Sequence, residues 1–206
     1  MYVKLMGLFS FRIRFLMATM PLILGFSALD VFSQVNETDA QGRKQGEWRK
    51  VQDGVLIYEG TFRDDKPVGE FTYYYPDGKL KARSRFSEQG SVSHTTLFHP
   101  SGQKMAEGRY IETRKDSIWH YYNEEEALVA VESYYMGEKH GLWTTYYPNG
   151  QASEEVPYRE GKREGVWKRY YPDGSVKSPA SYVGDKLEGL MQVFFPSGRV
   201  MMSGAY

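Results

Sequence analysis

The side chains best suited to acid–base or metal chemistry in the 206-residue chain are four histidines, His94, His99, His120 and His140. His94 and His99 are five residues apart, so on a strand they point to opposite faces and do not share a metal ion. His99 stands where related stretches of the chain hold tyrosine, which favours a structural role in an aromatic layer. A Ser-His-Asp arrangement is left open by the sequence, but no nucleophile-elbow motif occurs.

A carboxylate cluster, Asn123 followed by Glu124, Glu125 and Glu126, is the second candidate for chemistry. Ca²⁺ takes six to eight oxygen ligands from a looping segment. Three adjacent glutamates on an extended segment alternate between faces, so they supply about two ligands. We therefore expect a solvated turn here. The chain has no cysteine, which excludes thiolate metal sites and a cysteine nucleophile. No residue is assigned to catalysis, to a cofactor or to a metal ion.

A basic run is the third candidate, because Lys79, Lys81, Arg83 and Arg85 place four cations at alternate positions. On a strand, alternate positions share one face. Such a face is either simply solvated or a surface for an anionic partner, such as lipid headgroups or an envelope polymer. We include these four residues in a candidate binding surface.

A repeat of 24 residues organises the rest of the chain. Its fullest copies begin at Gly141 and Gly165 and read G-x-W-x-x-Y-Y-P-[DN]-G, with a further aromatic residue ten positions after the proline. A fixed period of this length is typical of repeat architectures. We expect seven repeats, which start at Gly46, Gly69, Ser93, Ser117, Gly141, Gly165 and Gly189.

Each repeat predicts one β-hairpin. The Pro-[Asn/Asp/Ser]-Gly segment is a turn signal between two strands, because proline presets its own φ and glycine accepts a positive φ. Along the second strand, residues alternate between an apolar face and a charged face, as in an antiparallel meander. Trp119, Trp143 and Trp167 fall on the apolar face, where a core role is expected, and they complete the candidate binding surface as parts of an aromatic ribbon.

The fold class is therefore all-β, an antiparallel meander of about seven hairpins in an elongated, twisted, single-layer sheet. Seven hairpins supply up to about 14 strands, and open sheets of more than about ten strands curl or split because neighbouring strands twist. The last strand, which ends at Tyr206, would expose an edge. We expect this C-terminal edge strand to pair with a second copy of the chain, by self-association, or with a strand of a partner; a strictly monomeric mature protein with a protected C-terminal strand would contradict this.

The N-terminal residues are of a different kind. Lys4, Arg12 and Arg14 precede an apolar run of 15 residues, from Phe15 to Leu29. This run is shorter than the roughly 20 residues that a spanning helix needs. Residues 1–33 therefore predict a secretory signal peptide cleaved before Gln34, with an uncleaved anchor as the alternative. Residues 34–45 are polar and without periodicity, which predicts a flexible leader before the repeat domain, residues 46–206.

The repeat pattern resembles the MORN family, and in particular the bacterial MORN variant found in YwqK-family antitoxin proteins. The resemblance covers residues 46–206 and is closest in the repeats that start at Gly69, Gly141 and Gly165. It implies an elongated antiparallel β-meander used for contacts with proteins or, in some members, with lipids. It implies no catalytic residue.

These observations predict an exported, non-catalytic protein-interaction or scaffold module, periplasmic, envelope-associated or extracellular. The alternative is the antitoxin component of a toxin–antitoxin pair, which rests on the family resemblance. We expect another protein as the partner, with anionic lipid or envelope polymer as the other option. The 26 basic and 26 acidic residues balance, so nothing in the charge points to nucleic acid.

Overall fold

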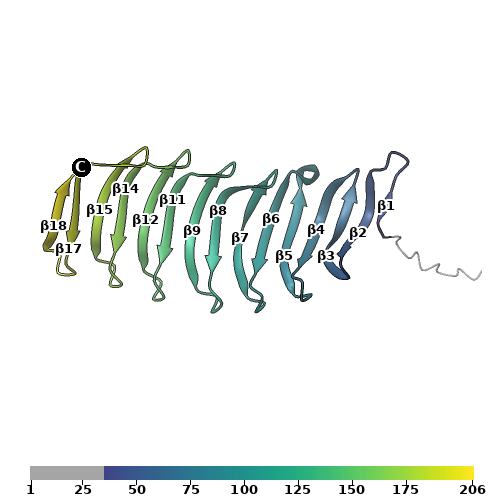
Figure 1. Cartoon of the computed structure of the whole chain (residues 1–206), viewed down its shortest axis with the longest axis horizontal. Helices are drawn as coiled ribbons and strands as arrows, with labels where there is room; N and C mark the ends of the chain where they lie inside the picture. The colour runs from purple at the N-terminus through teal and green to yellow at the C-terminus, as the bar shows by residue number, and fades with distance from the viewer. Residues whose placement is uncertain (1–34) are drawn as a thin grey trace, which may run out of the picture. The chain divides into compact units, whose positions relative to one another are not determined.

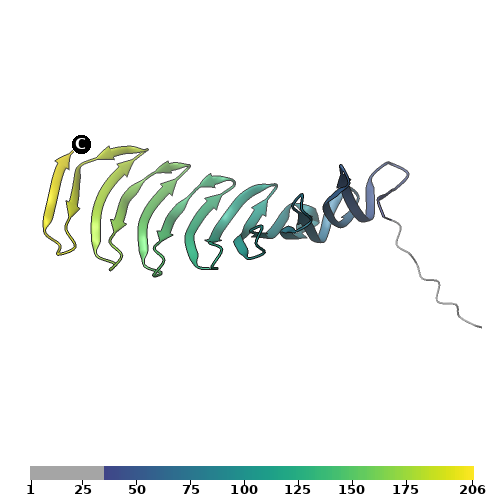
Figure 2. The same cartoon turned by 60° about the horizontal axis from the view of Figure 1, so that its bottom comes forward.

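The computed structural model describes residues 35–206, so the predicted signal peptide, residues 1–33, lies outside the described residues. Residues 35–206 form consecutive β-hairpins that lie side by side in a single row (Figure 1). Strand direction changes gradually along the row, as the right-handed twist of strands requires (Figure 2). The predicted all-β antiparallel meander is confirmed.

Residues 35–206 form 18 strands, more than the 14 expected, with 16 in the main sheet and two in the last hairpin, which is a separate sheet. The four extra strands are the short pieces β1, β10, β13 and β16, each of which pairs with the end of a longer strand. The strands are β1 (Glu37–Thr38), β2 (Lys44–Gln52), β3 (Val55–Arg63), β4 (Lys66–Tyr74), β5 (Leu80–Ser87), β6 (Val92–Phe98), β7 (Lys104–Ile111), β8 (Arg114–Tyr122), β9 (Leu128–Tyr135), β10 (Glu138–Lys139), β11 (Gly141–Tyr146), β12 (Ala152–Arg159), β13 (Lys162–Arg163), β14 (Gly165–Tyr170), β15 (Val176–Val183), β16 (Lys186–Glu188), β17 (Leu190–Phe194) and β18 (Val200–Ala205).

The turns inside the hairpins form where the Pro-x-Gly segments predict them. In the second repeat the N–H of Gly78 donates to the carbonyl of Tyr75 at 2.9 Å, and the N–H of Tyr75 donates to the carbonyl of Lys79 at 2.8 Å. Gly78 has φ 82°, a left-handed conformation that glycine adopts without a Cβ penalty. The same pair of hydrogen bonds recurs at Gly102, Gly150, Gly174 and Gly198.

The predicted repeat starts coincide with a second backbone feature. Positive φ angles occur at Gly46, Gly69, Ser117, Gly141, Gly165 and Gly189. The start at Ser93 differs, because a single 3-10 turn, η1 (Glu88–Gly90), precedes it and takes up the positive φ angles instead. As a result, the β5–β6 ladder runs without a bulge from Ala82 to Ser87.

The core is a row of aromatic rings on one face of the sheet. Trp119 is fully buried and Phe71 is 2% exposed. Each of these two rings lies directly against a glycine of the preceding strand, Gly108 under Trp119 and Gly60 under Phe71. A Cβ on Gly108 would lie 2.3 Å from the indole, so the glycine is required for this close approach.

Tyrosine hydroxyls connect successive repeats at the other end of the hairpins. Tyr75 donates to the carbonyl of Phe98 in the next repeat at 2.7 Å, and Tyr147 donates to the carbonyl of Tyr170 at 2.8 Å. His99 takes the tyrosine position in its repeat and places Nε2 3.0 Å from the carbonyl oxygen of Tyr122. The structural role expected for His99 is therefore confirmed.

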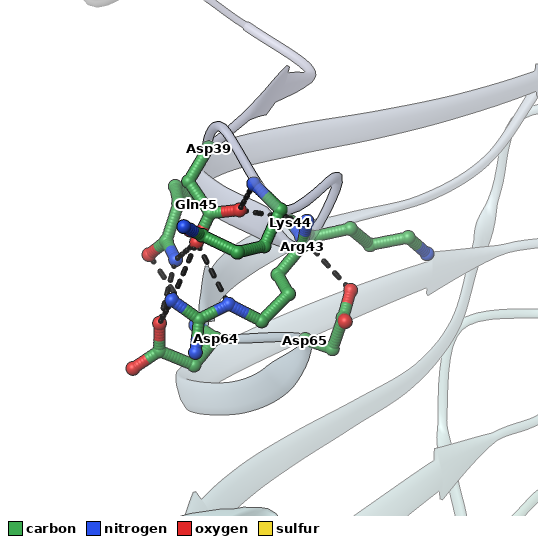
Figure 3. Close-up of polar contacts among 7 residues, drawn as sticks. Asp39, Arg43, Lys44, Gln45, Asp64 and Asp65 are labelled. Carbon is green, nitrogen blue, oxygen red and sulfur yellow. Dashed lines mark hydrogen bonds and ion pairs between the residues drawn. The ribbon is translucent and has the colours of Figure 1, made fainter.

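The flexible leader predicted for residues 34–45 is wrong for the residues from Glu37 onward, because β1 pairs with the start of β2. The polar side chains of this segment, which suggested a flexible leader, form a network of hydrogen bonds and ion pairs (Figure 3). Asp39 accepts the backbone N–H groups of Gln41 and Arg43 at 2.9 and 3.0 Å. Arg43 bridges Asp39 and Asp64 at 2.7 and 3.0 Å, which ties this turn to the one between β3 and β4.

At the other end of the row, β18 pairs only with β17 within residues 35–206. Its side chains are largely exposed, including Met201 at 49% and Met202 at 60%. The expected self-association through this strand stays a prediction. Among the described residues no helix is long and apolar enough to cross a membrane.

The fold predicts unequal costs for removing two tryptophans. Trp119→Ala is expected to lower the free energy of unfolding by about 3–5 kcal/mol, the range for a large buried ring. Trp167→Ala should cost less, because Trp167 is only half-buried. Urea unfolding followed by far-UV circular dichroism measures both. Equal losses at the two positions would contradict the assignment of Trp119 as the centre of the core.

Candidate functional site

The predicted basic run does not form one continuous surface. Arg83 and Arg85 are exposed and lie on the face opposite the aromatic rings. Lys79 lies in the turn before β5 and forms an ion pair with Asp77 at 3.3 Å. Lys81 turns its ammonium group over the ring of Tyr75, 5.8 Å from the ring centre. The division has a physical cause, because the β4–β5 ladder shifts by one residue near the turn.

Arg83 and Arg85 instead line a hollow of about 650 Å³ on the charged face, spanning β4 to β8. We call this hollow the basic cavity, and define it by its charged and histidine side chains. These are Glu70, Arg83, Arg85, His94, Glu107, Arg109 and His120. The sequence analysis did not connect His94, Arg109 and His120 with the arginines, since only strand register brings them together.

Register explains this grouping. Arg85 is the pairing partner of Glu70 on one side and of His94 on the other, and His94 in turn pairs with Arg109. Paired residues on one face of a sheet have Cβ atoms about 4.5–5.5 Å apart. Within residues 35–206 the side chains of Arg83 and Arg85 form no hydrogen bond or ion pair. They are therefore available to an external anionic group.

One edge of the basic cavity is fixed by an ion pair between the buried Asp116 and the partly exposed Arg109. Asp116, which is 5% exposed, accepts hydrogen bonds from Arg109 and from Ser117, the latter at 2.8 Å. Burial alone would raise the pKa of the Asp116 carboxyl. The hydrogen bonds from Arg109, Ser117 and the backbone N–H of Met136 outweigh burial and hold the pKa below its ordinary value.

The three tryptophans of the predicted binding surface lie on the other face. Trp119 has no exposed surface, so its assignment to a binding surface is wrong, and the cause is its close seat on Gly108. Trp143 and Trp167 are half-buried. Their indole N–H groups are already used, by the carbonyl of Ser133 at 2.7 Å and by the Glu154 carboxylate at 2.8 Å.

Sequence reasoning missed a recurring cation two residues before several repeat starts. Lys139 lies 4.1 Å from the ring centre of Trp143, and Lys115 lies 4.7 Å from that of Trp119. Lys44 and Arg163 lie over rings in the same way. Cations over aromatic faces are attracted by the ring quadrupole. The signal was present, because Lys115, Lys139 and Arg163 are themselves 24 residues apart.

A cluster of titratable groups surrounds Trp119 on the aromatic face. Lys115 contacts the Tyr121 hydroxyl, and Tyr134 donates to Glu132 at 2.7 Å. Burial lowers the pKa of Lys115, and burial together with hydrogen bonding raises the pKa of Tyr121. Every member has a partner within the cluster, so the arrangement supports the core and presents no free nucleophile.

The acidic turn behaves as a solvated turn. Glu124, Glu125 and Glu126 are exposed, and Asn123 closes the turn by accepting the N–H groups of Glu125 and Ala127 at 3.1 and 2.9 Å. Within residues 35–206 no group of three or more His, Asp or Glu side chains is placed to hold a metal ion.

Comparison with known proteins agrees with this geometry. Three segments match the MORN repeat variant family, residues 67–88, 139–160 and 163–183. Each segment begins two residues before a predicted repeat start. The matches cover parts of the second, fifth and sixth predicted repeats.

Other comparisons add no argument. No curated protein matches the chain. Among solved structures, a match is a point mutant of S. aureus TarM in complex with Fondaparinux, alpha-GlcNAc-glycerol and UDP, with 12% identity and a TM-score of 0.27. It covers 58% of this chain and 19% of that chain, and so low a TM-score supports no inference.

The ion pair at the edge of the basic cavity predicts a pH-dependent stability. Because the folded pKa of Asp116 lies below the unfolded value, its contribution is present above the unfolded pKa and disappears as the pH falls through the folded pKa. Asp116→Asn should cost about 1–2 kcal/mol at pH 7, since Arg109 is still 38% exposed and partly screened.

Urea unfolding of both proteins between pH 7 and pH 2 measures this effect. The difference between them should shrink below the ordinary aspartate pKa near 3.8. Glu138→Gln, an exposed carboxylate on β10, is the control and should be close to neutral. A difference that stays constant down to pH 2 would contradict the role of the Asp116 charge.

Proposed function

We propose that the chain is a non-catalytic interaction module of the cell envelope that binds an acidic segment of a protein partner in the basic cavity. The observation that carries this proposal is the pair Arg83 and Arg85, exposed on β5 and without a partner inside residues 35–206. Two neighbouring guanidinium groups can hold carboxylates through paired, geometrically specific hydrogen bonds.

The surroundings of these arginines favour a protein over a uniform polyanion. Glu70 and Glu107 also line the cavity, so a partner must present cationic or neutral groups beside its carboxylates. Glu107 is already held by Lys104 at 2.9 Å and by the Tyr122 hydroxyl at 2.9 Å. Mixed charges of this kind contribute more to partner choice and association rate than to affinity.

The fold supports a binding role. The antiparallel ladders between β5, β6 and β7 fix the register of these strands, so that their charged side chains stand at fixed spacing. Repeat proteins of this type offer extended surfaces to partners. The three MORN-type segments support the same general role, in protein or membrane binding.

Reversing the charge of Arg83 and Arg85 tests the proposal. The tagged chain from residue 34 to 206 is used to capture partners from an envelope extract of the native cells. We expect one stoichiometric protein, and at least a tenfold loss of it with Arg83→Glu and Arg85→Glu together, because two charge-assisted contacts become repulsive. Lys162→Glu with Lys186→Glu is the matched control, since both lysines are exposed and the change in net charge is the same.

The outcomes separate the alternatives. Equal capture by the arginine and lysine variants would contradict binding in the basic cavity. Recovery of only anionic lipid or envelope polymer, released by salt, would replace the protein partner with a polyanion. A small toxic protein in one-to-one ratio would favour the antitoxin function that the family resemblance suggests.

Export is the second part of the proposal, and it rests on the sequence of residues 1–33. Their basic start and short apolar run are typical of a cleaved signal peptide. We expect the protein isolated from native cells to begin at Gln34 and to be found in the envelope or outside the cell. Intact-mass measurement after fractionation tests this. A chain that retains residues 1–33 in the membrane fraction would indicate the anchor instead.

A further inference from the structure

Aromatic rings of successive repeats pack against one another along the row, but two repeats lack the ring two residues after their start, with Thr95 there in the third repeat and Met191 in the seventh. In the repeats that start at Gly69 and Gly141, the ring two residues after the start lies between the last aromatic ring of the preceding repeat and that of its own repeat. Phe71 lies 5.1 Å from both Phe62 and Phe86, centre to centre. Trp143 lies 5.1 Å from Tyr134 and 5.2 Å from Tyr158.

The third repeat lacks this ring. Thr95 stands at the position of Phe71 and Trp119, so no ring lies between Phe86 of the second repeat and Tyr110 of the third. Thr95 is 6% exposed and hydrogen bonds to the Ser84 hydroxyl at 2.8 Å. Three buried hydroxyls, of Ser84, Ser93 and Thr95, therefore form a polar floor where the other repeats have an aromatic ring.

The third repeat also lacks the cation that lies over aromatic rings in the repeats that start at Gly46, Ser117, Gly141 and Gly165. Lys115, Lys139 and Arg163 stand two residues before their repeat starts, and Ser91 occupies that position in the third repeat. Repeat three thus omits both the ring and the positive charge above it. The ring position that Phe71 and Trp119 fill in the two neighbouring repeats, and the cation position that Lys115 fills in the fourth repeat, are both without such a side chain at the same place.

A cavity occupies this place. Its volume is about 460 Å³, within the range of small-ligand sites. Phe86, Tyr110 and Tyr73 line it beside the polar floor, and Ser91 lies at one end. We call it the aromatic cavity. It lies on the face opposite the basic cavity, so it does not depend on the proposed function.

Charges at the two ends of the aromatic cavity differ. Glu112 lines the end next to Ser91, and its backbone N–H donates to the Ser91 carbonyl at 2.8 Å. Lys81 lines the other end, beside Ala82 at the start of β5. A positive group on a ligand is therefore favoured at the Ser91 end, the place where four other repeats have Lys44, Lys115, Lys139 or Arg163.

We propose that the aromatic cavity binds a free small molecule in which a planar aromatic ring carries an ammonium group on a short chain. The ring takes the place vacated at Thr95, between Phe86 and Tyr110, where stacking and edge contacts of aromatic rings are favourable. The ammonium group takes the place vacated at Ser91, close to Glu112. A ring N–H, as in indole, donates to the hydroxyls of Ser84 or Thr95.

Ligands that differ only in charge test this inference on the purified protein. Tryptamine has the ring and the ammonium group, indole has the ring alone, and indole-3-acetate reverses the charge. Amide and methyl NMR shifts of Thr95, Leu97 and Tyr110 should change saturably with tryptamine. We expect tryptamine to bind about fivefold tighter than indole, and indole-3-acetate to bind weakest, because one partly exposed ion pair is made or opposed.

Two variants locate the site. Ser84→Gly with Thr95→Phe recreates the pairing of Gly60 and Phe71 two strands away, so it should fold and abolish tryptamine binding. Ser91→Lys restores the usual cation at a half-buried surface position and should weaken tryptamine about fivefold while leaving indole unchanged. Thr145→Phe adds a ring at an exposed threonine in the fifth repeat and should not affect binding.

Several results would overturn the proposal. They are an absence of saturable shifts at millimolar tryptamine, equal binding of tryptamine and indole-3-acetate, and unchanged binding in both site variants. If the Ser84→Gly, Thr95→Phe protein fails to fold, the Ser91→Lys protein still decides, since its effect must appear for the ammonium ligand and not for neutral indole.

Discussion

The structure depends on a large aromatic ring, present in five of the seven repeats, that packs against the aromatic rings beside it. A single hairpin has too little apolar surface to be stable alone. Contact between Phe71 and both Phe62 and Phe86 joins two repeats into one core, and the chain repeats this contact along the row. Since each repeat touches only its neighbours, stability is close to a sum of such interfaces.

The same contact explains the small residues of the repeat. Gly60 and Gly108 have no side chain because the rings of Phe71 and Trp119 occupy the space that a Cβ would need. Positive φ angles at the repeat starts bring the next strand into position to deliver the ring. Tyrosine hydroxyls then fix the far end of each hairpin to the carbonyl of the next. The buried ring, the glycine beneath it and the tyrosine hydroxyl at the far end of the hairpin thus act together to pack one repeat against the next.

Much of this arrangement could be predicted from the sequence, because local chemistry decides it. The 24-residue period is visible in the sequence itself. Backbone geometry then predicts a turn at each Pro-x-Gly segment and places Ala82 and Arg83 on opposite faces of the strand. Pairing between distant residues was less accessible. The basic run was expected to form one surface, but a ladder shift near the turn separates Lys81 from Arg83. The polar sequence around Asp39 and Arg43 predicts a flexible leader, because polar composition does not distinguish an ordered hydrogen-bonded network from a flexible loop.

Departures from the repeat carry more functional information than its regular copies. In regular copies, such as the one that starts at Gly141, the ring, the cation and the indole N–H are all engaged within the chain. The region around the third repeat differs. On one face Arg83 and Arg85 have no partner within residues 35–206, and on the other face Thr95 and Ser91 leave room because they replace the ring and the cation. A change that empties both the ring position and the cation position weakens two neighbouring interfaces. The bulge-free β5–β6 ladder and the hydroxyl contacts of Ser84 and Thr95 offset this loss, so the strands stay paired while the surface opens.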